Sequence, residues 1–512
     1  MWSPTKPDLK TYRHFDHPIP VNAILPLVSD PKYVASHKFM PLLHFEKKWR
    51  RAPKKESGKL VRRKAKTREI RYPCRKDSYI FKYYRELLSV RYEAELAANG
   101  ISDCVIAYRH IPKRPGSESC KSNIEFARDA FEVVKEIGNC CAVAIDVSDF
   151  FGSMSHNRIK DTWANLLGVD HLPDDHFSVF TALTKYRYVD RDDAYVALGY
   201  SGYDADKKIR YLVKPDDIPV QICSNKQFRE KIVGGKLVKK NNADHGIPQG
   251  CPLSDLIANS YLKEFDIELA KYARSKGGRY FRYSDDILFI LPGDGRAALA
   301  AFKKASNEIK KMGPNLIIKA EKTEITIFKQ NDGVLAPVSF TVDADTQKST
   351  RKRSSDGMSY LGFRFDGQGV YLRNSTIANV AGKMFRTCQA VALNHVDRYL
   401  DKDIAWLLDN SPIDEVAERF FQVKDFEEAI SVARTAGRDP YRKMTFFSYA
   451  KRAADEFQPN GKQIERQTAK LKKQLEGMLN RQIVARYQTR DTRLALKRAE
   501  RTLKTVPKVT TS

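Results

Sequence analysis

Two neighbouring aspartates, Asp285 and Asp286, interrupt an otherwise apolar stretch, YFRYSDDILFIL (residues 280–291). Apolar runs on both sides of a short polar break predict an antiparallel hairpin with buried strands. Tight hairpin turns usually contain Asn-Gly or Gly-Gly, because these residues tolerate positive φ. Two like charges at the tip repel each other, and the repulsion costs stability unless a cation or another partner relieves it. The rest of the sequence has to supply that partner.

A second acidic position follows another apolar run, CAVAIDVSDFF (residues 141–151), whose strand would end near Asp146. If this strand and the hairpin share one sheet, three carboxylates converge. Carboxylate oxygens are the ligands that Mg²⁺ prefers, and two such ions can stabilise the attacking and leaving oxygens of a phosphoryl transfer. The residues alone leave a second interpretation open, in which the hairpin tip is charged and simply solvated.

The charge balance points to a polyanionic partner. The chain has 512 residues, with 90 Lys and Arg against 63 Asp and Glu, a net charge of +27. Nucleic acid is the simplest partner for such an excess, and an anionic membrane surface is the rival. We expect no membrane association, because no apolar run approaches the length of a bilayer span and the N-terminus lacks the apolar core of a signal peptide. A cytoplasmic protein with reduced cysteines is expected.

The pattern of apolar residues predicts several domains. Residues 1–45 form an N-terminal arm, and residues 46–71 hold 13 Lys and Arg against three Glu. Helices are expected over 78–98, 121–137, 155–168, 252–278 and 297–312, with strands over 315–320 and 322–328. Residues 176–245 are interpreted as a β-rich insertion. From about residue 376 the pattern becomes almost entirely helical and ends in a basic segment, 461–504.

Five segments in order, IDVSDFF, HGIPQGCPLSDLIANSYL, YSDD, KTEITIF and YLGFRF, resemble the palm motifs of reverse transcriptases. The resemblance covers roughly residues 60–370. It implies an α+β fold, a right-hand polymerase with fingers and palm, followed by a helical C-terminal domain. The implied domains are the arm (1–45), fingers (46–140), palm (141–375, with the insertion at about 176–245) and a basic helical domain (376–512), thumb-like or used in oligomerisation.

The resemblance also implies roles for single residues. Asp146, Asp285 and Asp286 match the metal-binding aspartates, and the Val147 carbonyl would face a metal. Two ions of Mg²⁺ are implied, with Mn²⁺ as the alternative. Phe151 matches the bulky residue that excludes a 2′-hydroxyl, which implies deoxynucleotide substrates, while Phe150 is expected in the core.

Further matches concern nucleotide and primer. Gln249 matches a glutamine of the nucleotide pocket. Arg68, and more weakly Lys66, match the basic residues that clamp the triphosphate, a task suited to the bidentate guanidinium. Lys322 matches a lysine near the leaving pyrophosphate that could act as a general acid. Leu361 and Gly362 match the turn that holds the primer end.

The motif set is most similar to bacterial reverse transcriptases of the unknown-group lineage, which includes abortive-infection and other defence-associated enzymes. The segment SNIEFA (residues 122–127) does not carry the retron signature, and no zinc-bearing endonuclease tail of the mobile-intron kind is found. This resemblance implies antiphage defence, an RNA template, a DNA product and dNTPs, often with a dedicated non-coding RNA. Whether the chain forms a homo-oligomer stays open.

Several alternatives also stay open. The chain could be a retron-like or mobile-intron-like reverse transcriptase, an RNA polymerase, or a non-catalytic RNA-binding protein built on a palm scaffold. The basic segment 461–504 could lie along a nucleic-acid backbone, or its stripe of leucines at 471, 475 and 479 could pack on the body of the protein or on a partner. Both can hold on opposite faces of one helix.

Overall fold

The computed structural model describes residues 2–49, 54–56, 59–61, 65–205, 208–342, 349–351, 356–421, 445–490 and 492. The chain divides into two compact units. The first contains Met1–Lys121 and Asp129–Met358, and the second contains Ser122–Arg128 and Ser359–Ser512.

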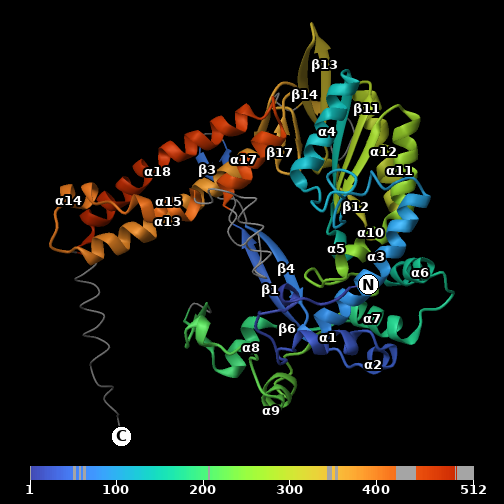
Figure 1. Ribbon diagram of the computed structural model, residues 1–512, viewed down its shortest axis with the longest axis horizontal. Coiled ribbons are helices and arrows are strands. Elements are labelled where there is room, and N and C mark those ends of the chain that lie inside the picture. Colours follow the sequence, from blue (N-terminus) through green and yellow to red (C-terminus); the bar gives the residue numbers. More distant parts are fainter. Residues whose placement is uncertain are drawn as a thin grey trace. The chain divides into compact units, whose positions relative to one another are not determined.

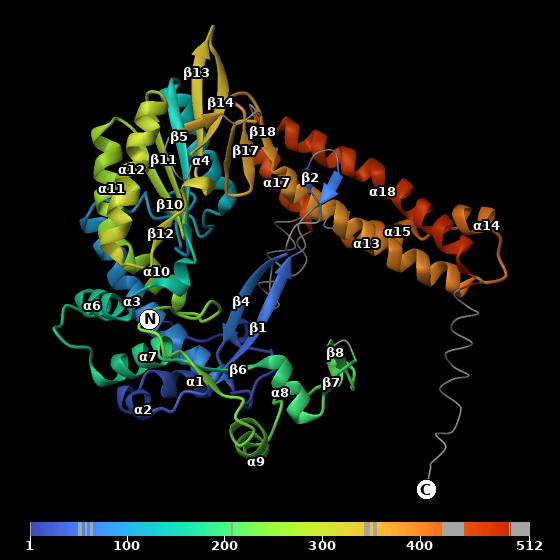
Figure 2. The same cartoon turned by 180° about the vertical axis from the view of Figure 1, so that it is seen from behind.

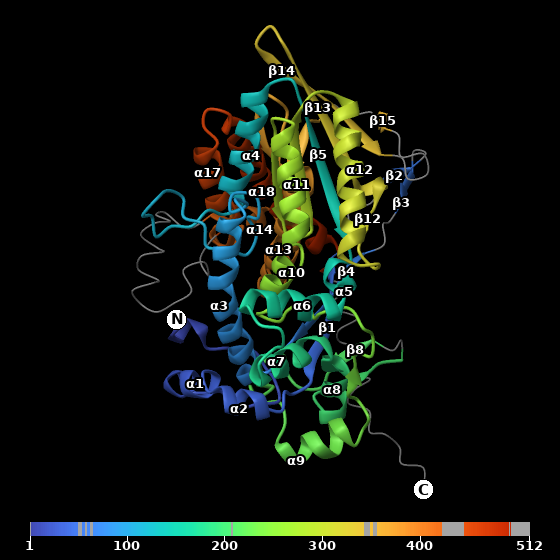
Figure 3. The same cartoon turned by 90° about the vertical axis from the view of Figure 1, so that its right-hand side faces the viewer.

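The first unit is built around a mixed layer of strands and helices. Its main sheet has the strand order β10-β11-β5-β13-β14-β15, and β12 pairs with the end of β5. The strands are β5 (Cys140–Ser148), β10 (Arg279–Tyr283), β11 (Asp286–Pro292), β12 (Ile317–Ile318), β13 (Glu324–Asn331), β14 (Val334–Val342) and β15 (Ser349–Arg351). Figure 3 shows α11 (Lys263–Ser275) and α12 (Gly295–Met312) running side by side over one face of this sheet, where α12 contacts β5.

The central strands form where the sequence is continuously apolar. Residues 287–291 of β11 and 140–143 of β5 are all buried, as expected of strands covered on both faces. β5 begins to alternate between buried and partly exposed residues at Ala144, so that Asp146 reaches solvent at the end of the strand. The predicted hairpin, and the predicted strand beside it, therefore share one sheet.

A second sheet in the first unit carries the basic N-terminal segment. Its order is β4-β1-β6-β9, formed by β4 (Lys66–Tyr72), β1 (Leu42–Trp49), β6 (Arg187–Asp190) and β9 (Lys239–Lys240). Figure 2 shows β4 and β1 extending as a long ribbon, with α1 (Val21–Val28), α2 (Pro31–Ser36) and α8 (Arg191–Leu198) around its base. Part of the segment 46–71 lies outside the described residues.

The β-rich interpretation of residues 176–245 is wrong. The segment contains most of α7 (Asp174–Thr184), then α8, α9 (Asn225–Gln227) and a π-helical turn (Phe228–Val233), with only short strands such as β7 (Ser201–Tyr203) and β8 (Ile209–Tyr211). Its apolar residues join residues of the N-terminal arm in a small separate core. The members of this core include Phe15, Leu43, Val189, Tyr195, Ile222 and Ile232.

The predicted helices of the first unit form with small shifts. α3 (Arg75–Ala98), α6 (His156–Leu167) and α12 match three of them, and α4 (Asn123–Ile137) begins in the second unit and ends in the first. The single helix expected over 252–278 is two helices, α10 (Ser254–Tyr261) and α11, which meet at Leu262. Of the strand expected over 315–320, only Ile317–Ile318 forms.

The second unit contains a three-stranded sheet and a group of helices. The strands are β16 (Met358–Tyr360), β17 (Phe363–Phe365) and β18 (Val370–Leu372). The helices, coloured orange to red in Figure 1, are α13 (Asn374–Arg398), α14 (Ile404–Asp409), α15 (Ile413–Phe421), α17 (Phe446–Glu456) and α18 (Lys462–Gln488). The helical character expected after residue 376 is confirmed for the described residues.

The leucine stripe of the basic segment packs inside the second unit. Leu471, Leu475 and Leu479 of α18 are buried against residues of α13 such as Met384 and Val391. The packing interpretation is therefore confirmed for this face, and the phosphate-binding interpretation of the other face stays a prediction. Residues 491 and 493–504 of the basic segment lie outside the described residues. In the described part of the chain, no helix is both long and apolar enough to span a bilayer.

Candidate active site

The structure brings two of the three predicted metal ligands into direct cross-strand register. β5 and β11 are antiparallel neighbours, and Asp146 pairs with Asp286. Directly opposed residues of an antiparallel pair share one face of the sheet, with Cβ atoms about 5 Å apart. Asp146 and Asp285 are partly exposed and Asp286 is exposed, so the carboxylates stand where the two central strands, β5 and β11, reach solvent.

The hairpin tip consists of two residues, Ser284 and Asp285, between the paired Tyr283 and Asp286. Ser284 has φ of 60°, the left-handed conformation that two-residue hairpin turns require and that usually selects glycine. The Asp285 carbonyl accepts a hydrogen bond of 3.1 Å from the Val147 N–H. This bond ties the tip to β5, so Asp285 is held beside the strand that carries Asp146.

Lys322 lies beside the end of β5 that carries Asp146. It is the last residue of a 3-10 turn (Ala320–Lys322) that leads into β13, and β13 pairs with β5 from Glu324 opposite Ala144 onward. The Nζ of Lys322 lies 2.5 Å from Asp146 Oδ2, with both side chains part-exposed. Asp146 is thus flanked by a carboxylate on one side and by an ammonium on the other. The ammonium offsets part of the like-charge repulsion between Asp146 and Asp286.

The donor set fits divalent cations of the hard kind. Three carboxylates near one end of the sheet offer oxygen ligands, which are the donors that Mg²⁺ and Mn²⁺ prefer. Among the described residues, no three His, Cys, Asp or Glu side chains are already close enough to ligate one ion. The Asp146 carboxylate is engaged by Lys322, so binding of an ion by the trio requires this carboxylate to reorient or to use its other oxygen.

The loop 246–250 packs between strand β4 and the segment 151–154, which follows β5. Gly246 donates from its N–H to the Met154 carbonyl (2.8 Å), and Ile247 donates to the Phe151 carbonyl (2.9 Å). A Cβ on Gly246 would lie 2.9 Å from the backbone oxygen of Gly152, and the φ of Gly246 is 86°. Glycine is therefore required here both by conformation and by space.

The same loop contacts β4 through Gln249 and Gly250. Arg71 donates its backbone N–H to the Gln249 carbonyl (2.9 Å). A Cβ on Gly250 would lie 2.9 Å from the Arg71 carbonyl oxygen and 3.1 Å from Ile70 Cγ2. Ile70 thus points toward the loop, and Arg68, two residues earlier in the strand, shares that face. The Gln249 backbone is thus held against β4, the strand that carries Arg68.

Other predicted positions are placed as follows. Phe150 is buried in the core at 3% exposure, while Phe151 is only partly buried and packs at the edge of that core. Val147 is buried and pairs with Ile318 of β12. Lys66 belongs to β4, and its side chain lies outside the described residues.

The predicted primer turn belongs to the second unit. Leu361 and Gly362 connect β16 to β17 and both have positive φ, 44° and 94°. The Leu361 carbonyl accepts a hydrogen bond of 3.2 Å from the Asn123 side chain. This bond fixes the turn within the second unit, and the role of the turn in holding the primer stays a prediction.

A buried ionic network beneath the hairpin was not predicted from the sequence. Arg282 of β10 and Asp266 of α11 are both fully buried and lie 2.6 Å apart. Burial opposes the charge on Arg282, yet the Asp266 carboxylate raises the pKa of the guanidinium above its ordinary value. Tyr280 also donates to Asp266 (2.7 Å). The apolar pattern requires burial at two positions that hold charged residues, Arg282 and Asp266. This conflict is the signal that could have revealed the pair.

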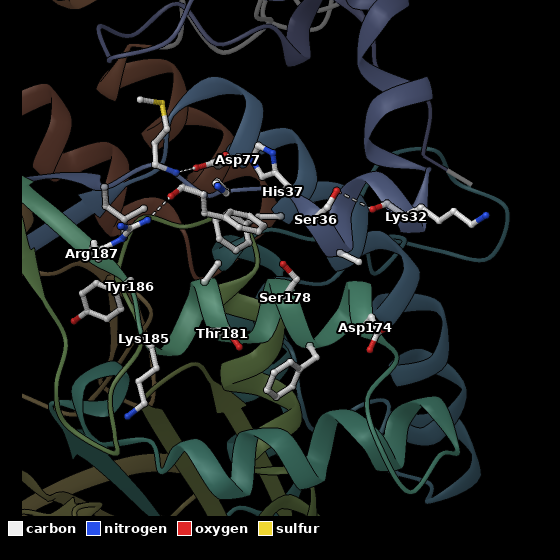
Figure 4. Close-up of a pocket in the computed structure, with 18 residues that line it drawn as sticks. Lys32, Ser36, His37, Asp77, Asp174, Ser178, Thr181, Lys185, Tyr186 and Arg187 are labelled. Carbon is white, nitrogen blue, oxygen red and sulfur yellow. Dashed lines mark hydrogen bonds and ion pairs between the residues drawn. The ribbon is translucent and has the colours of Figure 1, made fainter. Parts of the chain in front are cut away.

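A cavity of about 860 Å³ lies elsewhere in the first unit, between α2 and α7 (Figure 4). Its buried carboxylate, Asp77, accepts hydrogen bonds from the Met40 N–H and the His37 ring, each 2.8 Å. Lys32 lies toward one end of the cavity and Lys185 and Arg187 toward the other (Figure 4). The predicted site residues do not line this cavity, so it is separate from the carboxylates of the main sheet.

Comparison with known proteins identifies one domain. Residues 207–365, less than a third of the chain, match the family described as "Reverse transcriptase (RNA-dependent DNA polymerase)". The matched segment includes Asp285, Asp286 and Lys322 but not Asp146 or Arg68. The chain therefore contains a reverse transcriptase domain over these residues, and its mixture of helices and sheets agrees with the expected α+β fold. No curated protein matches the sequence.

Solved structures of low similarity include telomerases from Candida tropicalis. A truncated apo telomerase is 12% identical, with 62% of this chain and 54% of that chain covered and a TM-score of 0.36. A telomerase in complex with a fragment of telomeric RNA is also 12% identical, with 84% and 63% covered and a TM-score of 0.31. The chain spans less than two thirds of the length of these telomerase chains.

Proposed function

We propose that the chain copies RNA into DNA, adding dNTPs with the help of two divalent ions held by Asp146, Asp285 and Asp286. Mg²⁺ is the proposed ion and Mn²⁺ the alternative. The observation that carries the proposal is the direct pairing of Asp146 with Asp286 across two buried strands. Bound ions would neutralise the three carboxylates and stabilise the charge that develops on phosphate oxygens during nucleotide transfer.

The other predicted site residues would bind the nucleotide and the primer or transfer a proton. Lys322, already bonded to Asp146, would hold a proton at Nζ close to the leaving pyrophosphate. Arg68 would bind the triphosphate from β4, supported by its position on the strand face that meets the loop 246–250. Gln249 would line the nucleotide pocket, and the partly buried Phe151 would exclude a 2′-hydroxyl. Leu361 and Gly362 would hold the primer end.

The biological setting is proposed from the motifs. Their similarity to defence-associated bacterial reverse transcriptases, together with the helical region from α13 to α18, supports a role in antiphage defence in the cytoplasm. The net charge of +27 supports an RNA partner, and we propose a dedicated non-coding RNA as template. A homo-oligomer is compatible with this setting.

The test is incorporation of labelled dNTPs by the purified chain on a primed RNA template with Mg²⁺. Asp285→Asn and Asp286→Asn should each abolish synthesis, because each variant loses a negatively charged ligand. The same variants should lose protection of cells against phage. Full synthesis by either variant would refute the assignment of the site. Protection that survives loss of all three aspartates would favour a non-catalytic RNA-binding function.

A further inference from the structure

Arg282 lies under the hairpin tip with its guanidinium fully enclosed in protein. A guanidinium has five N–H donors, and five hydrogen bonds leave Arg282. Nε and Nη2 donate to the two oxygens of Asp266 at 2.7 and 2.6 Å. Nη1 and Nη2 donate to the side-chain oxygen and the carbonyl of Asn259 at 3.1 and 3.2 Å. The fifth bond, from Nη1, reaches the Ser284 carbonyl at 3.2 Å.

Four of these bonds therefore fix Arg282 to the helices α10 and α11, and the fifth fixes the turn. The two helix partners are themselves held. Asn259 donates to the Ala107 carbonyl (2.8 Å), and Asp266 accepts a further bond from Tyr280 (2.7 Å). The planar, rigid fork of the guanidinium transmits this fixed position to the Ser284 carbonyl, which a flexible ammonium with three donors would not do.

The turn itself requires such support. Ser284 has φ of 60°, a conformation that costs a non-glycine residue about 1 kcal/mol or more. A second contact holds the same residue, because the Tyr108 hydroxyl donates to Ser284 Oγ (3.1 Å). The peptide unit that follows the Ser284 carbonyl leads directly into Asp285. Any rotation of that carbonyl would therefore redirect the Asp285 side chain.

We propose that Arg282 is a positioning residue, which holds the Ser284 carbonyl so that Asp285 and Asp286 face Asp146 in a fixed direction for divalent ions. Asp266 and Asn259 provide the support from which it does so. The inference rests on the proposed function of the three aspartates and extends it to residues outside the metal site. Arg282 then has two separate roles. It neutralises the Asp266 carboxylate, which maintains the fold, and it donates to the Ser284 carbonyl, which orders the site.

The decisive variant is the double substitution Arg282→Met with Asp266→Leu. It removes both buried charges together, and such replacements with apolar residues of similar size often preserve stability. Arg282→Lys is the second variant, because it keeps the charge next to Asp266 but offers fewer and less rigid donors. Tyr280→Phe is the matched control, since it removes one bond to Asp266 and leaves the bond to Ser284 intact.

Three quantities are measured for each variant and for the wild type: the urea midpoint, the affinity for Mn²⁺ by electron paramagnetic resonance without nucleotide, and kcat with KM for dNTP on a primed RNA template. We expect the double variant and Arg282→Lys to remain folded. Their Mn²⁺ affinity and kcat should fall by about 10- to 100-fold, with a smaller change in KM. Tyr280→Phe should retain both the Mn²⁺ affinity and kcat of the wild type.

Two results would overturn the inference. One is a folded double variant, or a folded Arg282→Lys, with wild-type Mn²⁺ affinity and kcat. The other is an equal loss in Tyr280→Phe, which would mean that any disturbance of the network suffices. A wild-type chain that binds Mn²⁺ at the trio but makes no DNA would instead refute the proposed function, and the Mn²⁺ titrations of the variants would still decide the positioning role.

Discussion

Replacing Gly246 with alanine should disturb the proposed nucleotide pocket through a single methyl group. The new Cβ would lie 2.9 Å from the backbone oxygen of Gly152 and 3.5 Å from its Cα. The contact would be between the new Cβ and backbone atoms of Gly152, so no flexible side chain can move aside to relieve it. The loop 246–250 and the segment 151–154 would have to separate.

The expected cost has two parts. Alanine at φ of 86° costs about 1–2 kcal/mol relative to glycine, whatever surrounds it. Separation of the two segments would also weaken the bonds from Gly246 N–H to Met154 and from Ile247 N–H to Phe151. At about 1 kcal/mol each, their loss adds about 2 kcal/mol. Gly246→Ala should therefore lower the free energy of unfolding by about 3–4 kcal/mol.

Gly199 provides a matched control. It ends α8 with φ of 85°, and a Cβ there would meet nothing within 4 Å. Gly199→Ala should cost only the conformational part, about 1–2 kcal/mol. Urea unfolding of both variants measures the difference, and KM for dNTP should rise only in Gly246→Ala, because Gln249 moves with its loop. Equal destabilisation by the two substitutions, or an unchanged KM in Gly246→Ala, would refute the packing argument.

Three further predictions concern single side chains. Phe151→Ala should increase ribonucleotide incorporation by at least about tenfold in a competition assay, and a wild type that already prefers ribonucleotides would contradict the steric role. Lys322→Met should lower kcat by about 10²- to 10⁴-fold, whereas an unchanged kcat would exclude proton donation. Burial lowers the pKa of His14 from 6.5 to about 4, so its contribution to stability is complete above pH 6.5 and is lost as the pH falls toward 4. The free energy of unfolding should therefore drop by about 2 kcal/mol between pH 7 and pH 5, and His14→Gln should remove that drop in urea titrations at the two pH values.

The sheet that holds the aspartates could be predicted because its strands are continuous apolar runs. Residues 287–291 and 140–143 can be buried only between covering layers, and an acidic residue lies near each run, Asp286 just before the first and Asp146 shortly after the second. The pairing of Asp146 with Asp286 follows once the two strands are neighbours. The ion pair of Lys322 with Asp146 could not be read from the residues alone, because it depends on where the turn before β13 lies beside β5.

The region 176–245 could not be predicted because its order depends on distant partners. β6 pairs in parallel with β1, and Val189 of this short strand lies opposite Leu43. The apolar residues of the segment complete a core with Phe15 of the N-terminal arm. Local patterns of turn formers and β-branched residues suggested strands, and contacts across the chain favoured short helices instead.

The buried ion pair was missed for a different reason. Arg282 and Asp266 are charged residues at positions that the apolar pattern assigns to the interior, and both are fully buried. Their pairing depends on the contact of α11 with β10, which no local pattern contains. Charges within a predicted core strand and within the apolar face of a neighbouring helix are therefore worth testing as a pair.

Iron-mediated cleavage tests the central claim most directly. Fe²⁺ substituted for Mg²⁺, with ascorbate and peroxide, cuts the backbone close to the bound ion, and mass spectrometry locates the cuts. If ions bind among the three aspartates, cuts should cluster near residue 146 and near residues 285–286, and Asp146→Asn should suppress both clusters together. Cuts confined to other parts of the chain, or clusters that persist unchanged in Asp146→Asn, would contradict the claim.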